Sequence, residues 1–479
     1  MRPMTKTTCA LVSVLAALAC NPNDALKPPD PGVVTTIGAA ALPGIYAGSI
    51  SDFQLAWSGA GDVSNGGHEG HIGLSSIFTD EMTAAGLDIF TFRIQLDQRA
   101  ATPSNTQLYG IFNDMSAARV STELAATRFA QFAPTDIGHA EVENLSAYAY
   151  VQFAEDWCSG VPFSAINTKT GQLTYGVPLT TAQILARALQ KFDSASTLAT
   201  LNDTASSPVG QSNSTEQLAL SQLGRARVLL DMGQFDAAGA AADSALLTDP
   251  SLAYLIENST NTPRQYNGMW EYSEALDAFG VPNGKDGNGL QWRSASDPRV
   301  LWLDSHHLGS EFVDTIWYQM KYQQKFASAT LGSATEATLI SAERDLHDGN
   351  VPSWAAKLNA LRAGAGLTDT VRDSTGTPVV DNTGHIETFP MPPLSADSTT
   401  LASDSMRVEV HFRERAFWLW LTGERLADLR RLVRQYGHND FPNVSPAVNP
   451  NPDVRFSVPV QEQNNPNFHQ CLDAGHEQP

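Results

Sequence analysis

The chain has 479 residues, of which 42% are hydrophobic and 17% are charged, so it can bury a large apolar core and does not have the composition of a disordered protein. Acidic residues outnumber basic residues by 51 to 30, which gives a formal net charge of -21. A surface with this charge repels phosphate backbones and anionic lipid head groups, and the composition therefore argues against a nucleic-acid-binding protein.

The N-terminus has the features of a secretory signal peptide. Arg2 and Lys6 supply positive charge, and the apolar run that follows is too short to span a bilayer. Cys20 comes directly after this run, in a pattern that resembles the signals of bacterial lipoproteins, in which the cysteine is lipidated after cleavage. An ordinary secretory signal with an incidental cysteine is the alternative. We expect a signal peptide over 1–19 and, because a polar, Pro-rich run follows, an extended tether over 20–47.

Two further cysteines remain once Cys9 has left with the signal peptide. Cys158 and Cys471 could form one disulfide in an oxidising compartment, or Cys158 could be a buried free thiol near a helix end. The sequence contains no CxxC pair and no Cys/His cluster, which argues against a structural zinc site.

From residue 48 onwards the chain has the pattern of helices joined by turns. The clearest unit spans 220–250, in which a first helix, a break and a second, Ala-rich helix follow one another. Its small, aromatic and proline residues fall close to the positions that these residue types occupy in a tetratricopeptide repeat. Those residues are Ala226, Gly233, Phe235, Ala238, Ala245 and Pro250.

Three further helix pairs follow the same plan. They join 107–125 to 140–157, 180–197 to the helix from 218, and the two halves of 338–367. A single pair cannot bury its own apolar face, so several pairs must stack on one another. The sequence therefore predicts a mainly α fold, built on a scaffold of about four tetratricopeptide-like helix pairs.

Histidines lie close to a glutamate in two stretches, GGHEGHIG at 66–73 and SHHLGSEF at 305–312. Neither has the HExxH spacing, and their glycines and turn residues argue against two histidines on one helix face. A nucleophile elbow, a phosphate-binding loop and a dinucleotide-binding loop are absent from the sequence. We therefore expect no metal site, no cofactor and no catalytic residues.

Aromatic residues crowd into 254–322, where the helical pattern weakens. An exposed arc of aromatic rings would suit an oligosaccharide, because sugar rings stack their C–H faces on aromatic planes; the alternative is that most of these rings fill the core. Trp270 and Trp292 have polar neighbours and are expected to be exposed, whereas Trp302 and Trp317 have apolar neighbours and are expected to be buried. The candidate ligand-binding residues are Tyr266, Trp270, Tyr272, Trp292 and, from a Gly-rich stretch expected to be a loop, Trp57.

The stretch 413–437 places aromatic residues directly before a run of arginines. Apolar residues recur there at three- or four-residue steps, which predicts a core helix rather than a membrane-surface helix. The apolar seam consists of Phe412, Ala416, Leu419, Gly423, Leu426, Leu429 and Val433. Arginines and acids alternate beside this seam, so we expect ion pairs along a solvated helix flank. The arginines are Arg415, Arg425, Arg430 and Arg431, and the acids are Glu414, Glu424 and Asp428.

These residues also resemble the C-terminal signature of SusD/RagB-like outer-membrane lipoproteins, a Glu-Arg start that leads to Gly-x-Arg and Asp-Leu-Arg-Arg. The sequence departs from that signature at Trp418 and Thr422, where family members usually have acids. Further segments occur in the order that the family uses, so the resemblance covers nearly the whole mature chain. They are Cys20 and residues 75–82, 147–163, 220–250, 296–300, 338–367 and 456–468.

The resemblance implies one SusD/RagB-like domain over 48–479, and the weak helical pattern makes 250–335 a loop-rich insertion and the candidate ligand region. It also implies a lipid-anchored protein on the outside of the outer membrane, which captures oligomeric nutrients, usually glycans and in some members peptides. Its partner would be a SusC/RagA-like TonB-dependent barrel. A repeat scaffold that binds only protein partners is the second hypothesis, and a hydrolase on a helical frame is the third.

Overall fold

The computed structural model describes residues 38–61, 68–85, 91–167, 172–201, 213–309, 315–364, 368–370, 388–394 and 401–473. It divides into a short unit, Met1–Ala41, and a large one, Leu42–Pro479. The expected signal peptide and lipidation site, Cys20, lie outside the described residues. Helix α3, Leu42–Ser58, includes residues 42–47, the last part of the range expected for the tether.

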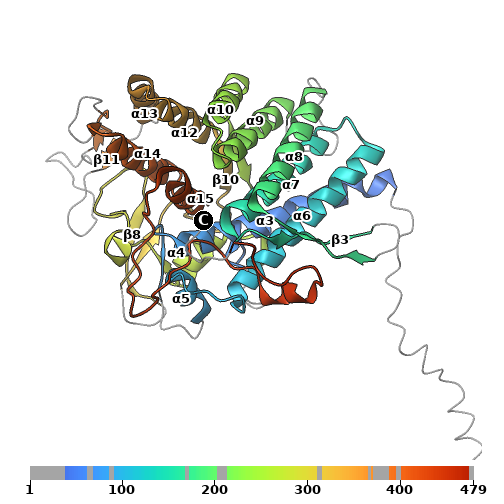
Figure 1. The fold of residues 1–479 in the computed structure, drawn as a ribbon, viewed down its shortest axis with the longest axis horizontal. Coiled ribbons are helices and arrows are strands. Elements are labelled where there is room, and N and C mark those ends of the chain that lie inside the picture. The colour runs from blue at the N-terminus through green and yellow to red at the C-terminus, as the bar shows by residue number, and fades with distance from the viewer. Residues whose placement is uncertain are drawn as a thin grey trace, which may run out of the picture. The chain divides into compact units, whose positions relative to one another are not determined.

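The large unit contains a row of helices in which each contacts the next (Figure 1). Helix α3 packs on α6, and the chain then continues from α6 to α10 and on to α12 and α13. This arrangement confirms the predicted helix-pair scaffold. The helices of the row are α6 (Thr106–Phe132), α7 (Ile137–Asp156), α8 (Thr181–Leu201), α9 (Ser214–Asp231), α10 (Phe235–Thr248), α12 (Ala334–His347) and α13 (Val351–Gly364).

Local sequence explains where these helices begin. Asn105 starts α6, and its side chain accepts hydrogen bonds from the backbone N–H groups of the first turn, which have no partner within the helix. Asp136, Asn213 and Ser333 cap α7, α9 and α12 in the same way. The predicted boundaries are therefore close to the observed ones.

Small residues allow the helices to approach one another closely. A Cβ added at Gly224 would lie 2.2 Å from the ring of Phe192, which belongs to the preceding helix, α8. Ala226, Ala238 and Ala245, three of the repeat-like positions, are at most 1% exposed. The small residues of 220–250 thus have the packing role that the repeat pattern predicts.

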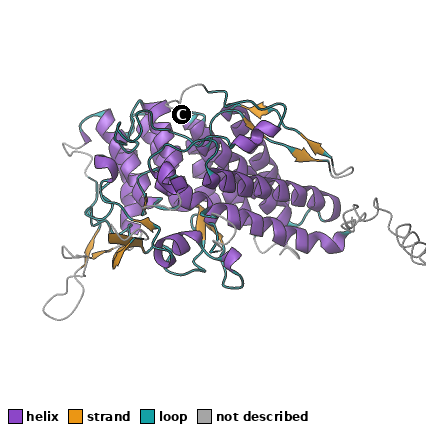
Figure 2. Cartoon of the chain, turned by 90° about the horizontal axis from the view of Figure 1, so that it is seen from below, coloured by secondary structure: helices purple, strands orange, loops and turns teal. Residues whose placement is uncertain are grey.

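The region between α10 and α12 contains only short elements. Figure 2 shows that the strands are short and scattered among the helices rather than gathered in one central sheet. Strand β6 (Ala253–Ile256) pairs with β10 (Ala329–Ser333), and β8 (Trp302–Leu308) pairs with β9 (Thr315–Gln319). The other elements are η2 (Pro263–Gln265), α11 (Gly268–Trp270), η3 (Glu271–Ala275), β7 (Phe279–Gly280) and η4 (Lys285–Gly287).

The remaining elements join this region to the helix row. Strand β7 pairs with β1 (Thr83–Ala84), and two further short pairs follow α7. In the described part of the chain no helix has both the length and the apolar composition that a membrane span requires. Outside the helix row and the region between α10 and α12, the chain also forms α4 (Gly70–Phe78), α5 (Thr91–Asp97), β2 (Val161–Pro162), β3 (Ala165–Ile166), β4 (Leu173–Thr174), β5 (Pro178–Leu179), β11 (Thr368–Thr370), β12 (Thr388–Pro390) and η7 (Val460–Asn464).

The C-terminal helix is broken, whereas the sequence predicted one continuous helix. Helix α14 (Asp404–Trp418) ends before Leu421 and Gly423, both of which have positive φ, and α15 (Arg425–Arg431) and η6 (Leu432–Tyr436) follow. The break brings the backbone next to His71, whose Nε2 lies 3.2 Å from the carbonyl oxygen of Gly423. The apolar seam is buried as predicted, apart from the half-buried Val433.

The prediction of a solvated arginine flank is wrong. Arg415, Arg425, Arg430 and Arg431 are each at most 5% exposed. Three of them contact carboxylates, two of which come from distant segments: Arg425 lies 2.8 Å from Asp80, and Arg431 contacts both Glu343 and Asp428. Helical spacing showed the alternation of charges but could not show that other elements cover this face.

Arg430 has a different environment, because its guanidinium donates to backbone carbonyl oxygens. The acceptors belong to Ala154, Glu155 and Trp157, at the C-terminal end of α7. The last carbonyls of a helix have no partner within it and carry partial negative charge, so a cation there is favourable. Arg430 thus joins α15 to the end of α7.

A disulfide joins Cys158 and Cys471, whose Cα atoms are 5.9 Å apart. Of the two alternatives for Cys158, the structure therefore has the disulfide. The bond ties the C-terminal segment to the residues that follow α7, across 313 positions of sequence.

Candidate ligand-binding sites

Three of the five predicted ligand-binding aromatics lie in the core. Trp57, Tyr272 and Trp292 have no exposed surface, so none of them offers a ring face to a ligand. The exposure expected of Trp292 is therefore wrong, and the two further candidates Trp57 and Tyr272 are buried as well.

Each of the three rings is buried by neighbours that are distant in sequence. Trp57 belongs to the last turn of α3 rather than to a loop, and its ring centroid lies 4.9 Å from that of His71. Tyr272 lies beneath the guanidinium of Arg93 at 4.7 Å. Polar neighbours in sequence did not indicate exposure, because the adjacent residues point in other directions.

Trp292 shows how a polar flank can accompany a buried ring. Its indole N–H donates to the backbone oxygen of Asp80, and the ring lies 4.9 Å from that of Phe417. The polar atom of the ring is therefore satisfied inside the core, where a buried tryptophan usually needs such a partner.

Trp302 and Trp317, expected in the core, are half-buried instead. They face each other across the β8–β9 hairpin in an edge-to-face arrangement, with centroids 5.3 Å apart. The guanidinium of Arg293 lies 4.0 Å from the ring centroid of Trp317. The apolar neighbours that suggested burial alternate along surface strands, where successive side chains point to opposite faces.

Tyr266 and Trp270 are the two predicted ligand residues that keep exposed surface. Their rings are half-buried and edge-to-face, with centroids 6.5 Å apart. The ammonium of Lys325 lies 4.6 Å from the Tyr266 centroid. We call Tyr266, Trp270, Lys325 and the neighbouring Glu271 and Glu274 the aromatic cluster.

Asn267 holds the backbone of the aromatic cluster in place. Its side-chain oxygen accepts from the backbone N–H of Trp270 at 3.1 Å, and its amide nitrogen donates to the carbonyl oxygen of Ala327 at 2.9 Å. The backbone N–H of Asn267 donates to the backbone carbonyl oxygen of Lys325 at 2.7 Å. The aromatic rings therefore stand on a fixed turn, which limits the entropy lost when a ligand binds.

The two acids of the aromatic cluster have perturbed electrostatics. Burial raises the pKa of the Glu274 carboxyl to about 7, although a hydrogen bond from Trp270 opposes the shift. Burial also raises the pKa of Glu271, which Lys325 partly offsets. Partly buried carboxyls beside aromatic rings can accept hydrogen bonds from sugar hydroxyls, while the rings stack on the sugar faces.

The described histidines of these stretches contact separate carboxylates rather than sharing one centre. His68 lies 2.8 Å from Asp114, whose hydrogen bond raises the pKa of that histidine, and His71 lies 2.8 Å from Asp156. His306 lies 3.4 Å from Asp304, whereas Glu311 is outside the described residues.

Among the described residues, one set with metal-ligand distances occurs, consisting of Cys158, Cys471 and Asp473. Its two sulfurs form the disulfide, so neither is available as a thiolate ligand.

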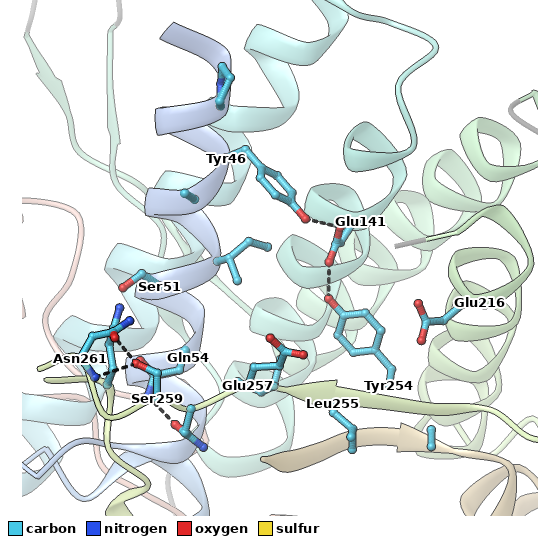
Figure 3. A pocket seen from close by; sticks show the side chains of 17 residues that line it. Tyr46, Ser51, Gln54, Glu141, Glu216, Tyr254, Leu255, Glu257, Ser259 and Asn261 are labelled. Atoms are coloured by element: carbon cyan, nitrogen blue, oxygen red, sulfur yellow. Dashed lines mark hydrogen bonds between the residues drawn. The ribbon is translucent and has the colours of Figure 1, made fainter. Parts of the chain in front are cut away.

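Sequence reasoning missed a cavity of about 700 Å³ beside α3 (Figure 3). Within it, the hydroxyls of Tyr46 and Tyr254 donate to the two carboxylate oxygens of Glu141, at 2.6 and 2.7 Å. Burial raises the pKa of Glu141, although both tyrosine hydrogen bonds oppose the shift. The lining comes from helices α3, α7 and α9 and from the segment that begins with β6, so no single stretch of sequence indicated the cavity.

Comparison with protein-family models finds no match, and no curated protein matches the sequence. Solved structures do match. A SusD superfamily protein from Bacteroides vulgatus has a TM-score of 0.61 and 15% identity, over 91% of this chain and 99% of that one. A SusD/RagB family protein from Bacteroides thetaiotaomicron has a TM-score of 0.59 and 12% identity, over 90% of this chain and 95% of the other.

A third similar structure is surface glycan-binding protein A from Bacteroides thetaiotaomicron, in complex with laminarihexaose. It has a TM-score of 0.60 and 12% identity, over 90% of this chain and 99% of the other. Identities this low show a shared fold and do not by themselves transfer a ligand or a residue's role. The chain therefore has the SusD/RagB-like fold that the sequence resemblance implied.

Proposed function

We propose that this protein binds an oligosaccharide at the aromatic cluster. The observation that carries the proposal is the pair of half-buried rings, Tyr266 and Trp270, on a fixed turn beside two carboxyls and one ammonium group. Rings of this kind can stack on sugars, and the charged groups can bond to sugar hydroxyls. The fold shared with a protein that was solved with laminarihexaose also supports a glycan as the ligand.

The partly exposed hairpin β8–β9 would extend this binding surface. The Tyr318 hydroxyl donates to Asp277 at 2.5 Å, just past η3, and Gln319 donates to Glu274 of the aromatic cluster at 3.2 Å. The hairpin that presents Trp302 and Trp317 is thus joined directly to the cluster. An oligomer can contact several rings at once, so each contact can be weak enough to permit later release.

Direct binding measurements test this proposal. Isothermal titration calorimetry with laminarihexaose and with other β- and α-linked hexasaccharides should identify a ligand for the purified mature protein. The double variant Tyr266→Ala/Trp270→Ala should weaken that binding by more than about tenfold, because aromatic contacts at a binding hot spot contribute about 2 kcal/mol or more.

A matched control is Tyr175→Ala, which removes a ring that is 43% exposed on a different part of the surface. It should leave binding unchanged. Unaltered affinity in a folded Tyr266→Ala/Trp270→Ala protein would contradict the proposed site, and a test of the hairpin rings Trp302 and Trp317 would follow.

We further propose that the chain is anchored in the outer membrane by lipid on Cys20 and passes its ligand to a SusC/RagA-like TonB-dependent barrel. Each buried acyl methylene contributes about 0.8 kcal/mol, so several acyl chains hold a protein firmly. Cys20→Ala should release the protein from outer membranes. Affinity purification from solubilised membranes should recover the barrel with the wild-type protein.

The two other hypotheses predict different results. A tetratricopeptide-like scaffold would bind proteins and no glycan or peptide. A hydrolase would shorten the bound oligomer, which chromatography of the products would detect. The proposal of a binding protein requires intact ligand after prolonged incubation.

A further inference from the structure

One face of the hairpin β8–β9 combines two half-buried rings with a cation and an acid. The guanidinium of Arg293 lies 4.0 Å from the ring centroid of Trp317. Asp304 is directly opposite Trp317 in the strand pair, so the two side chains share a face of the hairpin. Trp302, two positions before Asp304, points to the same face, because side chains alternate along a strand.

The guanidinium of Arg293 has donors that the described part of the chain leaves unused. It donates to none of the described residues, and its Nε is buried without an acceptor. Burial lowers the pKa of Arg293, and the negative charge of Asp304 offsets only part of this effect. A partly buried donor without an acceptor costs free energy, so an acceptor on a ligand would stabilise it.

The carboxylate of Asp304 has an unused acceptor. Its Oδ1 accepts from the backbone N–H of His306 at 2.8 Å and lies 3.4 Å from Nδ1 of the same histidine. None of the described residues donates to Oδ2. The side chain is 19% exposed, so a donor on a ligand can reach it.

These two charged groups act on each other but form no ion pair with each other. A ligand that bridges them must offer an acceptor to the guanidinium and a donor to the carboxylate, and two adjacent hydroxyl groups of a sugar do both. An anionic group would be attracted by Arg293 but repelled by Asp304, and a cationic group would meet the reverse. The balance of charge therefore favours an uncharged ligand.

The loop that presents Arg293 is held in place before a ligand arrives. The preceding residue, Trp292, is fully buried, and its indole N–H donates to the backbone oxygen of Asp80. The backbone N–H groups of Arg293 and Ser294 both donate to Oδ1 of Asn283, at 3.2 and 2.9 Å. A fixed backbone limits the entropy that is lost on binding.

We propose that Arg293 and Asp304, together with the rings of Trp302 and Trp317, form a second sugar subsite that takes an uncharged unit through two adjacent hydroxyl groups. The guanidinium donates to one hydroxyl, and the carboxylate accepts from the next. This inference rests on the proposed function, because it requires that the ligand is a glycan and that it extends from the aromatic cluster onto the hairpin.

The direct test compares three β-1,4-linked hexamers, of glucose, of glucuronic acid and of glucosamine, at a pH where the last two are charged. Each glucose unit of this oligomer keeps adjacent hydroxyls at its second and third carbons. In calorimetry the wild-type protein should bind the glucose hexamer at least about tenfold more tightly than either charged hexamer, because each charged hexamer meets one like charge in the subsite.

Two variants should change this order of affinities in opposite ways. Asp304→Asn keeps an oxygen for the N–H of His306 but removes the negative charge, so the glucuronic acid hexamer should gain affinity relative to the glucose hexamer. Arg293→Gln removes the positive charge, so the glucosamine hexamer should gain instead. Each variant should weaken binding of the glucose hexamer about tenfold, equivalent to about 1.4 kcal/mol, because a hydrogen bond to a charged group is lost.

Matched controls remove the same charges elsewhere. Arg413→Gln and Asp236→Asn alter exposed positions on α14 and α10, and both should leave all three affinities unchanged. A subsite variant that only loosened the packing of the hairpin would weaken the three hexamers alike and keep their order. The change of order is therefore the result that a structural role does not produce.

Equal affinities of the wild-type protein for the three hexamers would overturn the inference, and so would an unchanged order in both subsite variants. Loss of glucose-hexamer binding in Tyr266→Ala/Trp270→Ala, with full binding in both subsite variants, would uphold the proposed function and refute the subsite alone. Binding of laminarihexaose without binding of the glucose hexamer would have the same meaning. Binding of neither neutral oligomer would contradict the proposed function and the subsite together.

Discussion

The side chain of Arg431 lies in the core with 1% of its surface exposed, and it contacts Glu343 and Asp428 at 2.5 and 2.8 Å. Burial alone would raise the pKa of the Asp428 carboxyl, but the positive charges of Arg415 and Arg431 lower it by more. The pKa of Asp428 is therefore below its ordinary value. The same balance holds the pKa of Glu343 well below its ordinary value. These acids are charged in the folded protein, so they depend on the arginine.

Arg431→Ala should therefore destabilise the protein by about 3–5 kcal/mol, because it leaves two carboxylates buried without their main partner. Urea denaturation measures the change. Arg413→Ala is the matched control, since Arg413 lies exposed on the preceding helix α14, and it should cost under about 1 kcal/mol. Equal effects would show that the buried ion pairs contribute no more than a surface charge does.

Glu274 supplies a pH-dependent prediction at the aromatic cluster. Its pKa rises from 4.5 to about 7 on folding, so the folded chain retains a proton that the unfolded chain loses. Glu274 makes its full contribution to the free energy of unfolding below pH 4.5, and that contribution falls as the pH rises toward about 7. The melting temperature of Glu274→Gln, relative to wild type, should thus rise between pH 5 and 8, roughly, and level off above. A constant difference across this range would contradict the raised pKa.

Among the helices, the break between α14 and α15 depends on one glycine. Gly423 has a φ of 89°, in the left-handed region, and a Cβ there would lie 2.4 Å from Nε2 of His71. A glycine is required both by the backbone conformation and by the close approach of His71.

Gly423→Ala should consequently lower stability by more than about 1 kcal/mol, because it adds backbone strain and a steric overlap. Gly48→Ala is a suitable control. Gly48 lies inside helix α3, and nothing is within 4 Å of an added Cβ, so alanine should stabilise by about 0.5–1 kcal/mol. Thermal unfolding of the two variants should therefore shift in opposite directions.

At the scale of the whole molecule, the disulfide joins the end of the chain to the middle of the helix row. Cys158→Ser/Cys471→Ser should lower the free energy of unfolding by about 2–4 kcal/mol. A reductant should lower the melting temperature of the wild-type protein but not that of the double variant. A wild-type protein insensitive to reductant would show that the bond adds little to stability.

Periodicity, capping residues and small residues are local properties, and for that reason the sequence alone determined the helix pairs and the apolar seam. Asn105 can cap α6 regardless of which element packs on that helix. The alanines at 226, 238 and 245 likewise permit close contact regardless of which helix is the neighbour. The resemblance to SusD/RagB-like proteins followed from segments spaced along the chain, and the fold bears it out.

Only the tertiary structure decided which charges and rings are buried. The buried charge of Arg425 is paired with Asp80, which lies 345 positions away in the sequence. The backbone carbonyl oxygen of Asp80 also accepts the indole N–H of the buried Trp292. The cavity beside α3 likewise exists only where α3, α7, α9 and the β6 segment meet. Burial is a property of contacts between distant segments, and no local pattern of residue types contains it.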